Sequence, residues 1–221
     1  HSLGGMIGPA YTLSFPENVT SVSLLSTAAF RTTEDKYKVL AVLTSMRENG
    51  IGPILSTLTE RWFTDQFIKA RSADVEFRLQ QVLETDPEVF LDVFRIYAET
   101  EMSPWLNKIK HPCLVLTGEN DGGCSPRLNH LIADSLSNSE LCILKNYKHS
   151  LLIEAPYEVG MGCGKKDITG KWHSSIWPAQ CPECLQTNSD SRSLITVVEV
   201  EGSYYAECTN NCGFSANYFS I

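Results

Sequence analysis

The 221-residue sequence has no apolar run close to the ~20 residues that a membrane-spanning helix needs, and no low-complexity tract. No charged segment followed by a short apolar one opens the chain, so we expect no secretory signal and a cytoplasmic protein. Basic residues are scarce, with 18 Lys and Arg against 26 Asp and Glu. Because the net charge is −8, neither a nucleic acid nor an anionic membrane is expected as a partner.

Cysteine is unevenly distributed along the chain. Five of the eight cysteines fall within residues 161–221, at positions 163, 181, 184, 208 and 212. A secreted disulfide framework spreads its pairs through a short chain, whereas clustered pairs are typical of a metal site. The alternation of strands and helices also stops near Gly160. We therefore predict two domains, residues 1–160 and residues 161–221.

The first domain alternates predicted strands and helices. Val19–Thr27, Pro112–Thr117 and residues 139–147 are short apolar runs of the kind that form buried strands. Helices are predicted for residues 4–15 and for residues 127–136, which separate the second and third strands. Strand, helix and strand of these lengths form a βαβ unit, so the domain is predicted to be α/β.

A helical insert is predicted between the first and second strands, over about residues 34–100. Gly50 is expected to end its first helix, and Pro87 to occupy the first turn of its last one. Residues 75–83 and 89–97 place apolar side chains at helical spacing. The pattern predicts several amphipathic helices.

Three residues follow one another at the positions that nucleophilic catalysis requires. Ser2 precedes the first helix, Asp121 lies in the loop after the second strand, and His149 follows the third strand. A serine hydroxyl needs a histidine to take its proton, and a carboxylate holds that histidine in the useful tautomer. Taken singly, the serine is typical of a helix cap, the aspartate of a turn and the histidine of a solvated side chain.

Two other carboxylates compete with Asp121 for the role of the acid. Glu119 comes very early after the strand, and Asp134 falls within the following helix. Because loops at the carboxyl ends of neighbouring parallel strands converge on one point, Asp121 is the preferred acid.

The motifs around these residues resemble the α/β-hydrolase family, in particular its 3-oxoadipate enol-lactonases and carboxylesterases. "HSLGGMIG" is similar to the nucleophile elbow and its helix, "ERWFT" (60–64) to the cap, "TGENDGGCSP" to the acid loop and "KHSLLIEAP" to the histidine loop. The resemblance implies a serine hydrolase of a carboxylic ester or lactone that needs no cofactor. It also implies that Ser2 is the nucleophile, Asp121 the acid, His149 the general base and the Leu3 backbone N–H an oxyanion donor.

The resemblance begins at the elbow. In that family several strands and the second oxyanion donor precede the nucleophile, and the sequence contains no match to them. We therefore expect a hydrolase part that is truncated before the elbow, which weighs against activity of this chain alone.

The C-terminal domain carries two close cysteine pairs. Cys181 and Cys184 are followed, after 23 residues, by Cys208 and Cys212. Four thiolates in two pairs surround Zn²⁺ tetrahedrally at ~2.3 Å and leave no open position for catalysis. The two segments between the pairs, "SLITVVEVEG" and "SYYAEC", are predicted to form a hairpin across Gly202. We therefore predict a zinc-ribbon-like β module with a structural zinc ion; redox, disulfide-bonded or buried cysteines are the alternatives.

The same tail is loosely similar to the zinc-binding domain of phage late-transcription activators of the Ogr/Delta type, in "CPEC", "YYAEC" and "CGFSANYFS". Residues 161–221 hold four Lys and Arg against six Asp and Glu, which favours a protein partner over nucleic acid. The sequence thus predicts the C-terminal part of an α/β-hydrolase with a helical cap, joined to a zinc ribbon. The alternative function is a non-enzymatic zinc-ribbon protein, transcription-related or protein-binding, that carries a hydrolase remnant.

Overall fold

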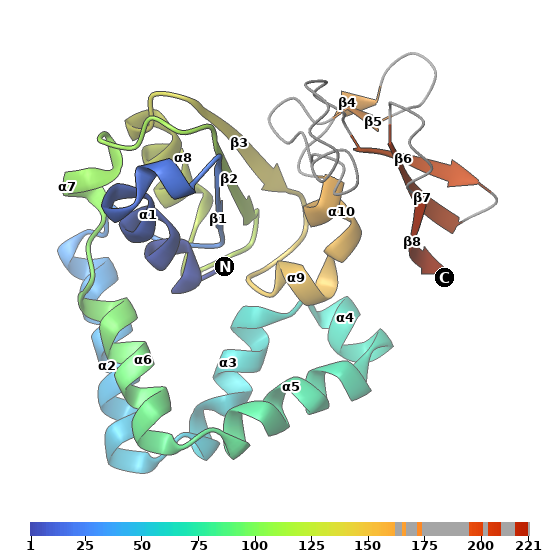
Figure 1. The fold of residues 1–221 in the computed structure, drawn as a ribbon. Coiled ribbons are helices and arrows are strands. Elements are labelled where there is room, and N and C mark those ends of the chain that lie inside the picture. The colour runs from blue at the N-terminus through green and yellow to red at the C-terminus, as the bar shows by residue number, and fades with distance from the viewer. Residues whose placement is uncertain (162–164, 167–171, 174–194, 201–202, 209–214, 221) are drawn as a thin grey trace. The chain divides into compact units, whose positions relative to one another are not determined.

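A computed structural model describes residues 1–161, 165–166, 172–173, 195–200, 203–208 and 215–220 (Figure 1). The chain divides into two compact units, His1–Val159 and Gly160–Ile221. In the described part, no helix is both long and apolar enough to cross a membrane.

A parallel sheet forms the centre of the first unit. Its strands β1 (Val22–Leu25), β2 (Cys113–Gly118) and β3 (Ser139–Leu144) lie in the order β1-β2-β3. Every residue of β2 is buried, as expected of a central parallel strand. The predicted α/β architecture is confirmed.

Two helices pack against this sheet, α1 (Gly4–Ser14) on β1 and α8 (Pro126–Ser135) on β2 and β3. Met6 of the first helix and Ile132 of the second belong to one buried cluster with Val115 of the sheet. Because both helices bury apolar side chains in one cluster, the loops that precede them are anchored at fixed positions beside the strand ends.

Five helices form the insert between β1 and β2, as the sequence predicts. They are α2 (Thr33–Asn49), α3 (Leu55–Trp62), α4 (Asp65–Ala70), α5 (Ser72–Glu84) and α6 (Pro87–Glu99). Figure 1 shows them on one side of the sheet, with α2 and α6 running side by side. We call this insert the cap. Gly50, at φ +83°, ends α2, and Pro87 begins α6, so both predicted boundaries are confirmed.

Short helical turns complete the first unit. They are η1 (Pro16–Asn18), η2 (Gly52–Ile54), α7 (Ser103–Leu106), α9 (Leu151–Glu154) and α10 (Pro156–Met161).

Arg31 joins the two ends of the cap. Its buried guanidinium donates to the carbonyl oxygens of Tyr97 (2.7 Å), Ala98 (3.1 Å) and Thr100 (3.3 Å). These carbonyls close α6, while Arg31 itself lies just before α2. A cation at a helix C-terminus is favourable because the last carbonyls lack intrahelical donors. One side chain therefore holds the entry and the exit of the cap together.

Two strands end earlier than predicted, for the same reason. β1 ends at Leu25 because Ser26 takes φ +42°, and β3 ends at Leu144 shortly before Asn146, which takes φ +66°. A left-handed residue turns the chain out of the extended conformation. Both residues lie at the carboxyl end of the sheet, where the loops toward the candidate site begin.

In the second unit, the residues that the structure describes after Met161 form short antiparallel strands. β4 (Lys165–Lys166) pairs with β5 (Trp172–His173), and β6 (Ile195–Val200), β7 (Ser203–Cys208) and β8 (Ser215–Ser220) form a three-stranded sheet. The predicted hairpin is thus confirmed as β6–β7.

The predicted zinc ligands are not defined by this structure. Cys181, Cys184 and Cys212 lie outside the described residues, and Cys208 is described only as the last backbone position of β7. The zinc ion remains a prediction from the sequence.

Candidate active site

Ser2 occupies a strained turn at the carboxyl end of β1. Its φ is +53°, its backbone N–H donates to Leu25 O (2.9 Å), and its carbonyl oxygen accepts from Thr27 Oγ1 (2.9 Å). A Cβ at Gly5 would overlap Thr27, so glycine lets the start of α1 pack closely beneath the turn. A left-handed serine directly before a helix is the geometry of the second half of a nucleophile elbow; the strand that would precede it in a complete elbow is not in this sequence.

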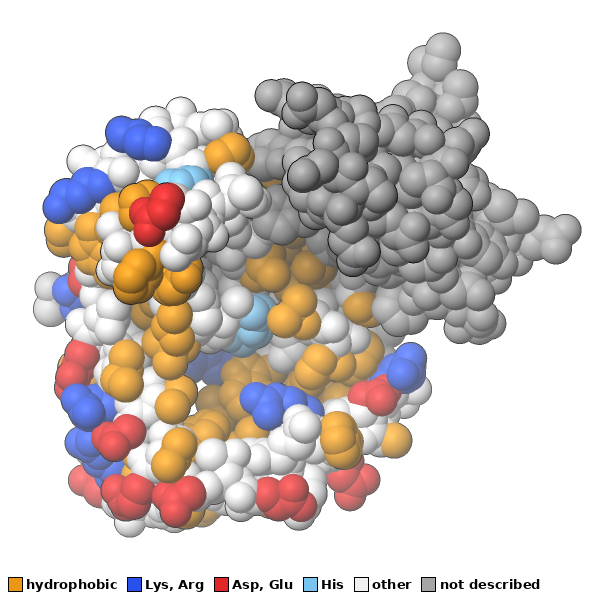
Figure 2. Space-filling view, viewed as in Figure 1, with side chains coloured by type: hydrophobic (Ala, Val, Ile, Leu, Met, Phe, Trp, Pro, Cys, Tyr) orange, Lys and Arg blue, Asp and Glu red, His pale blue; other side chains and the backbone are white. Residues whose placement is uncertain are grey.

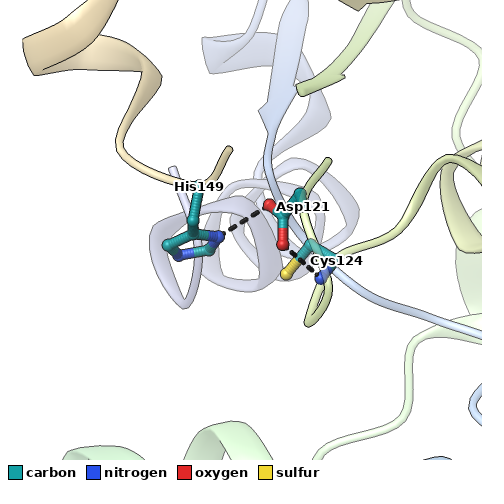
Figure 3. Close-up of side chains that lie close together, drawn as sticks. All are labelled: Asp121, Cys124 and His149. Atoms are coloured by element: carbon teal, nitrogen blue, oxygen red, sulfur yellow. Dashed lines mark hydrogen bonds and ion pairs between the residues drawn. The ribbon is translucent and has the colours of Figure 1, made fainter. Parts of the chain in front are cut away.

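Asp121 and His149 meet at the ends of β2 and β3 (Figure 3). His149 Nδ1 and Asp121 Oδ2 are 2.7 Å apart, and the aspartate is almost fully buried, with 2% of its surface exposed. Its other oxygen, Oδ1, accepts from the backbone N–H groups of Gly123 (3.0 Å) and Cys124 (2.8 Å). The carboxylate is therefore fixed at both oxygens, and it in turn fixes the imidazole.

Gly118 allows the acid loop and the histidine loop to approach each other. A Cβ at this last residue of β2 would overlap the backbone carbonyl oxygens of Tyr147 and Lys148, just before His149. In addition, Asn120 N–H donates to Tyr147 O (2.9 Å). Only glycine fits this approach, which sets the distance between the acid and the histidine.

The ion pair shifts the pKa values of both partners. Burial raises the pKa of Asp121, but hydrogen bonds from His149 and from two backbone N–H groups outweigh it and hold the pKa below its ordinary value. Burial acts in the opposite direction on His149 and lowers its pKa. The hydrogen bond to Asp121 and the neighbouring Cys124 outweigh burial and raise the pKa of His149 to about 10. The folded protein therefore favours a carboxylate beside a protonated imidazole.

Ser2, Asp121 and His149 all line one cavity of about 540 Å³. Among the described residues, His149 is hydrogen-bonded to Asp121 but not to the Ser2 hydroxyl. Within the described part of the chain, the Ser2 hydroxyl donates to and accepts from no protein atom, and the Leu3 N–H has no acceptor. Both groups are therefore available to a molecule in the cavity.

The cap supplies most of the remaining cavity wall. Figure 2 shows a hollow in this face that is lined largely by hydrophobic side chains. The apolar lining residues of the cap are Val39, Val42, Leu58, Trp62, Phe90, Val93, Phe94 and Tyr97. Arg61 and Arg78 add two guanidinium groups to the wall, and neither forms an ion pair with an acid of the described residues. The cavity is thus apolar with local positive charge.

The competing acids lie elsewhere. Glu119 is exposed and accepts from Asn146 N–H (3.0 Å), and Asp134 is exposed on α8. Of the two aromatic residues in "ERWFT", Trp62 lines the cavity, whereas Phe63 is fully buried in the cap.

Sequence reasoning missed two residues that the fold brings to the site. Cys124 lies beside Asp121, and its thiol shares a hydrogen bond of 3.1 Å with the hydroxyl of Tyr97, which comes from α6. Burial, followed by the effect of Cys124, raises the pKa of Tyr97 well above its ordinary value, so the hydroxyl stays protonated. Helical spacing had marked Tyr97 only as part of an apolar face, and no sequence signal links it to Cys124.

Comparison with known proteins relates the sequence to hydrolases. It is 28% identical over 155 residues to 3-oxoadipate enol-lactonase 2 of Acinetobacter baylyi, covering 70% of this chain and 57% of that enzyme. It is 23% identical over 163 residues to the (E)-2-((N-methylformamido)methylene)succinate hydrolase of the same bacterium, covering 72% and 60%. No protein-family profile matches the sequence. The chain thus spans about half to three fifths of the length of the curated relatives it matches.

Solved structures define the fold. The crystal structure of the enol-lactonase from Burkholderia xenovorans LB400 aligns with a TM-score of 0.63 at 21% identity, covering 70% of this chain and 58% of that one. The first unit therefore has the α/β-hydrolase fold.

Proposed function

We propose that this chain hydrolyses a carboxylic ester or lactone through an acyl-enzyme on Ser2. The observation that carries the proposal is the buried hydrogen bond between Asp121 and His149. Both residues line the same cavity as Ser2, which has a strained backbone. The similarity to an enol-lactonase supports the same class of reaction. His149 is the general base and then the general acid, and Asp121 orients it.

Acylation begins when the neutral form of His149 takes the hydroxyl proton of Ser2; because the raised pKa makes this form a minority at neutral pH, the rate increases with pH. Because Nδ1 is held by Asp121, the nitrogen that accepts the proton is Nε2. Ser2 Oγ bonds to the carbonyl carbon, and the carbonyl electron pair moves onto its oxygen, which the Leu3 N–H stabilises. When the intermediate collapses, the bond to the leaving alkoxide breaks and His149 returns the proton to it. In a lactone this step opens the ring, and the new hydroxyl stays on the acyl group.

Deacylation repeats these steps with water. His149 takes a proton from the water molecule as its oxygen bonds to the acyl carbon, and then gives that proton to Ser2 Oγ as the acyl bond breaks. The products are a carboxylic acid and free enzyme. The protonated imidazole that forms twice in each turnover is the species that buried Asp121 favours.

The cavity wall indicates the kind of substrate. Its apolar side chains suit a short acyl chain or a lactone ring, and Arg61 and Arg78 suit an anionic group on the same molecule. We therefore propose a small ester or lactone that carries a carboxylate.

The test is the rate of p-nitrophenyl ester and small-lactone hydrolysis by the full chain and by Ser2→Ala. We expect Ser2→Ala to lose more than about 1,000-fold in kcat, since the acyl-enzyme cannot form. Ser14→Ala is the matched control, because Ser14 is exposed on α1 and its hydroxyl bonds only within the helix, to Ala10 O. Equal rates for the full chain and Ser2→Ala would rule out the proposal.

For the second unit we propose the structural zinc ion on Cys181, Cys184, Cys208 and Cys212. The hairpin β6–β7, which lies between the two pairs in sequence, supports it. Zinc would crosslink the segments of the chain that carry the cysteines, and a protein surface remains the proposed partner of the module. Elemental analysis of the reduced chain should find about one zinc ion that Cys181→Ser and Cys184→Ser together remove; a metal-free chain contradicts the proposal.

A further inference from the structure

The thiol of Cys124 lies against the catalytic acid and histidine without a part in the proposed reaction. Cys124 N–H donates to Asp121 Oδ1, and this bond folds the loop back so that the side chain returns beside the carboxylate. One ligand atom each from Asp121, Cys124 and His149 lies within 4.8 Å of the other two. Figure 3 shows the three side chains close together. A thiol, a carboxylate and an imidazole thus converge on one small volume.

This set of donors is that of a zinc site. Zn²⁺ binds cysteine sulfur at ~2.3 Å, histidine nitrogen at ~2.0 Å and carboxylate oxygen at ~2.1 Å, so ligand atoms around one ion are about 3.5 Å apart. The three atoms are close to that spacing, and side-chain shifts on the order of 1 Å would complete it. The cavity on which these residues open provides both a path of entry and room for water as a fourth ligand.

Neighbouring side chains hold the Cys124 side chain in place. Cys124 has 1% of its surface exposed, and the Tyr97 hydroxyl lies 3.1 Å from its sulfur. Tyr97 is itself held by the Arg31 guanidinium, 4.6 Å from the centre of its ring. Such partners outside the ligand shell orient a ligand and raise its affinity for metal.

We propose that Asp121, Cys124 and His149 form a binding site for a borderline-soft divalent cation such as Zn²⁺, and that the bound cation stops hydrolysis. The binding half stands on the geometry alone, whereas the inhibition half rests on the proposed function. Binding releases the thiol proton and, from a protonated His149, one imidazole proton, whichever ring nitrogen the cation takes; the other ring nitrogen keeps its proton. If it takes Nδ1, the bond to Asp121 is lost; if it takes Nε2, the acceptor for the Ser2 proton is lost. Mg²⁺ and Ca²⁺, which prefer oxygen ligands, do not compete.

Metal binding is tested first, by dialysing the full chain and its variants against Zn²⁺ and counting zinc per chain. Cys124→Ala should hold one zinc ion fewer than the unmodified chain. Cys113→Ala is the matched control, since Cys113 is also a buried free thiol but lies in β2, outside the cluster. The C-terminal cysteines are the same in all three proteins, so their zinc cancels in the difference. With Co²⁺ as a spectroscopic probe, the thiolate-to-cobalt absorption should likewise be weaker in Cys124→Ala, and Cys124→Ser serves if the alanine variant does not fold.

Inhibition is tested second, with each protein compared with its own zinc-free rate. Zn²⁺ should inhibit the unmodified chain and Cys113→Ala, and half-inhibition of Cys124→Ala should need at least about tenfold more zinc. Equal zinc contents in the unmodified chain, Cys113→Ala and Cys124→Ala would contradict the proposed metal site. An extra zinc ion without inhibition would overturn the regulatory half. If the chain hydrolyses no ester, the proposed function is wrong, but the zinc count still tests the metal site. Ser2→Ala should bind as many zinc ions as the unmodified chain, because Ser2 is not one of the proposed ligands.

Discussion

Replacing Asp121 by asparagine changes one atom at the centre of the proposed machinery. Two backbone N–H groups point at Oδ1, so the amide oxygen must stay there. The amide NH₂ then takes the place of Oδ2 and faces His149 Nδ1. Because NH₂ donates, Nδ1 must become the acceptor, and the ring proton moves to Nε2. The histidine is then held in the tautomer that cannot take the Ser2 proton.

The loss follows from that tautomer. In serine hydrolases with a Ser-His-Asp triad, the wrong histidine tautomer lowers kcat about 10⁴-fold. This corresponds to a loss of about 5.4 kcal/mol of transition-state stabilisation. The assay is the kcat for a p-nitrophenyl ester, measured across pH for the full chain and Asp121→Asn. Circular dichroism of both proteins checks that the fold is kept. The histidine pKa, followed by NMR, should fall in the variant because the carboxylate charge is gone.

The matched control is Glu119→Gln, which removes the neighbouring carboxylate two residues earlier in the same loop. Glu119 is exposed and its side chain bonds only to Asn146 N–H, so its variant should keep activity within a few-fold. The reasoning is wrong if folded Asp121→Asn stays within tenfold of the unmodified chain, or if Glu119→Gln loses as much.

Two further predictions concern stability. The pKa of His149 is raised from 6.5 to about 10, so the folded chain keeps a proton that the unfolded chain releases, and stability should fall as pH rises through this range. Urea midpoints should show this slope in the unmodified chain and a smaller one in His149→Gln; identical slopes contradict it. Gly118→Ala should destabilise by about 1–3 kcal/mol in thermal unfolding, because its Cβ overlaps backbone. Gly122→Ala, whose Cβ meets nothing within 4 Å, should change stability by less than about 0.5 kcal/mol, and equal effects would refute the role of Gly118.

Local patterns were sufficient for most of the first unit. The apolar run that became β2 is buried along its whole length, and Gly50 and Pro87 bound their helices as expected. These features depend on residues close in sequence, which is why periodicity and capping chemistry find them. The strand ends were less predictable, since the left-handed turn at Ser26 is imposed by the loop that supports the elbow and leaves no periodic signal.

By itself, the sequence determined the order of strands and helices, and placed Ser2 before the first helix and Asp121 and His149 after the second and third strands. The order is enough for such residues to be predicted as neighbours, because neighbouring strand ends meet at one edge of a sheet. Only the tertiary structure decided how they meet: the approach at Gly118, the burial of the Asp121–His149 pair and the arrival of Tyr97 from the cap at Cys124. Those contacts join segments 27 or more residues apart. Their distances depend on how the cap and the sheet pack, and no local pattern records that packing.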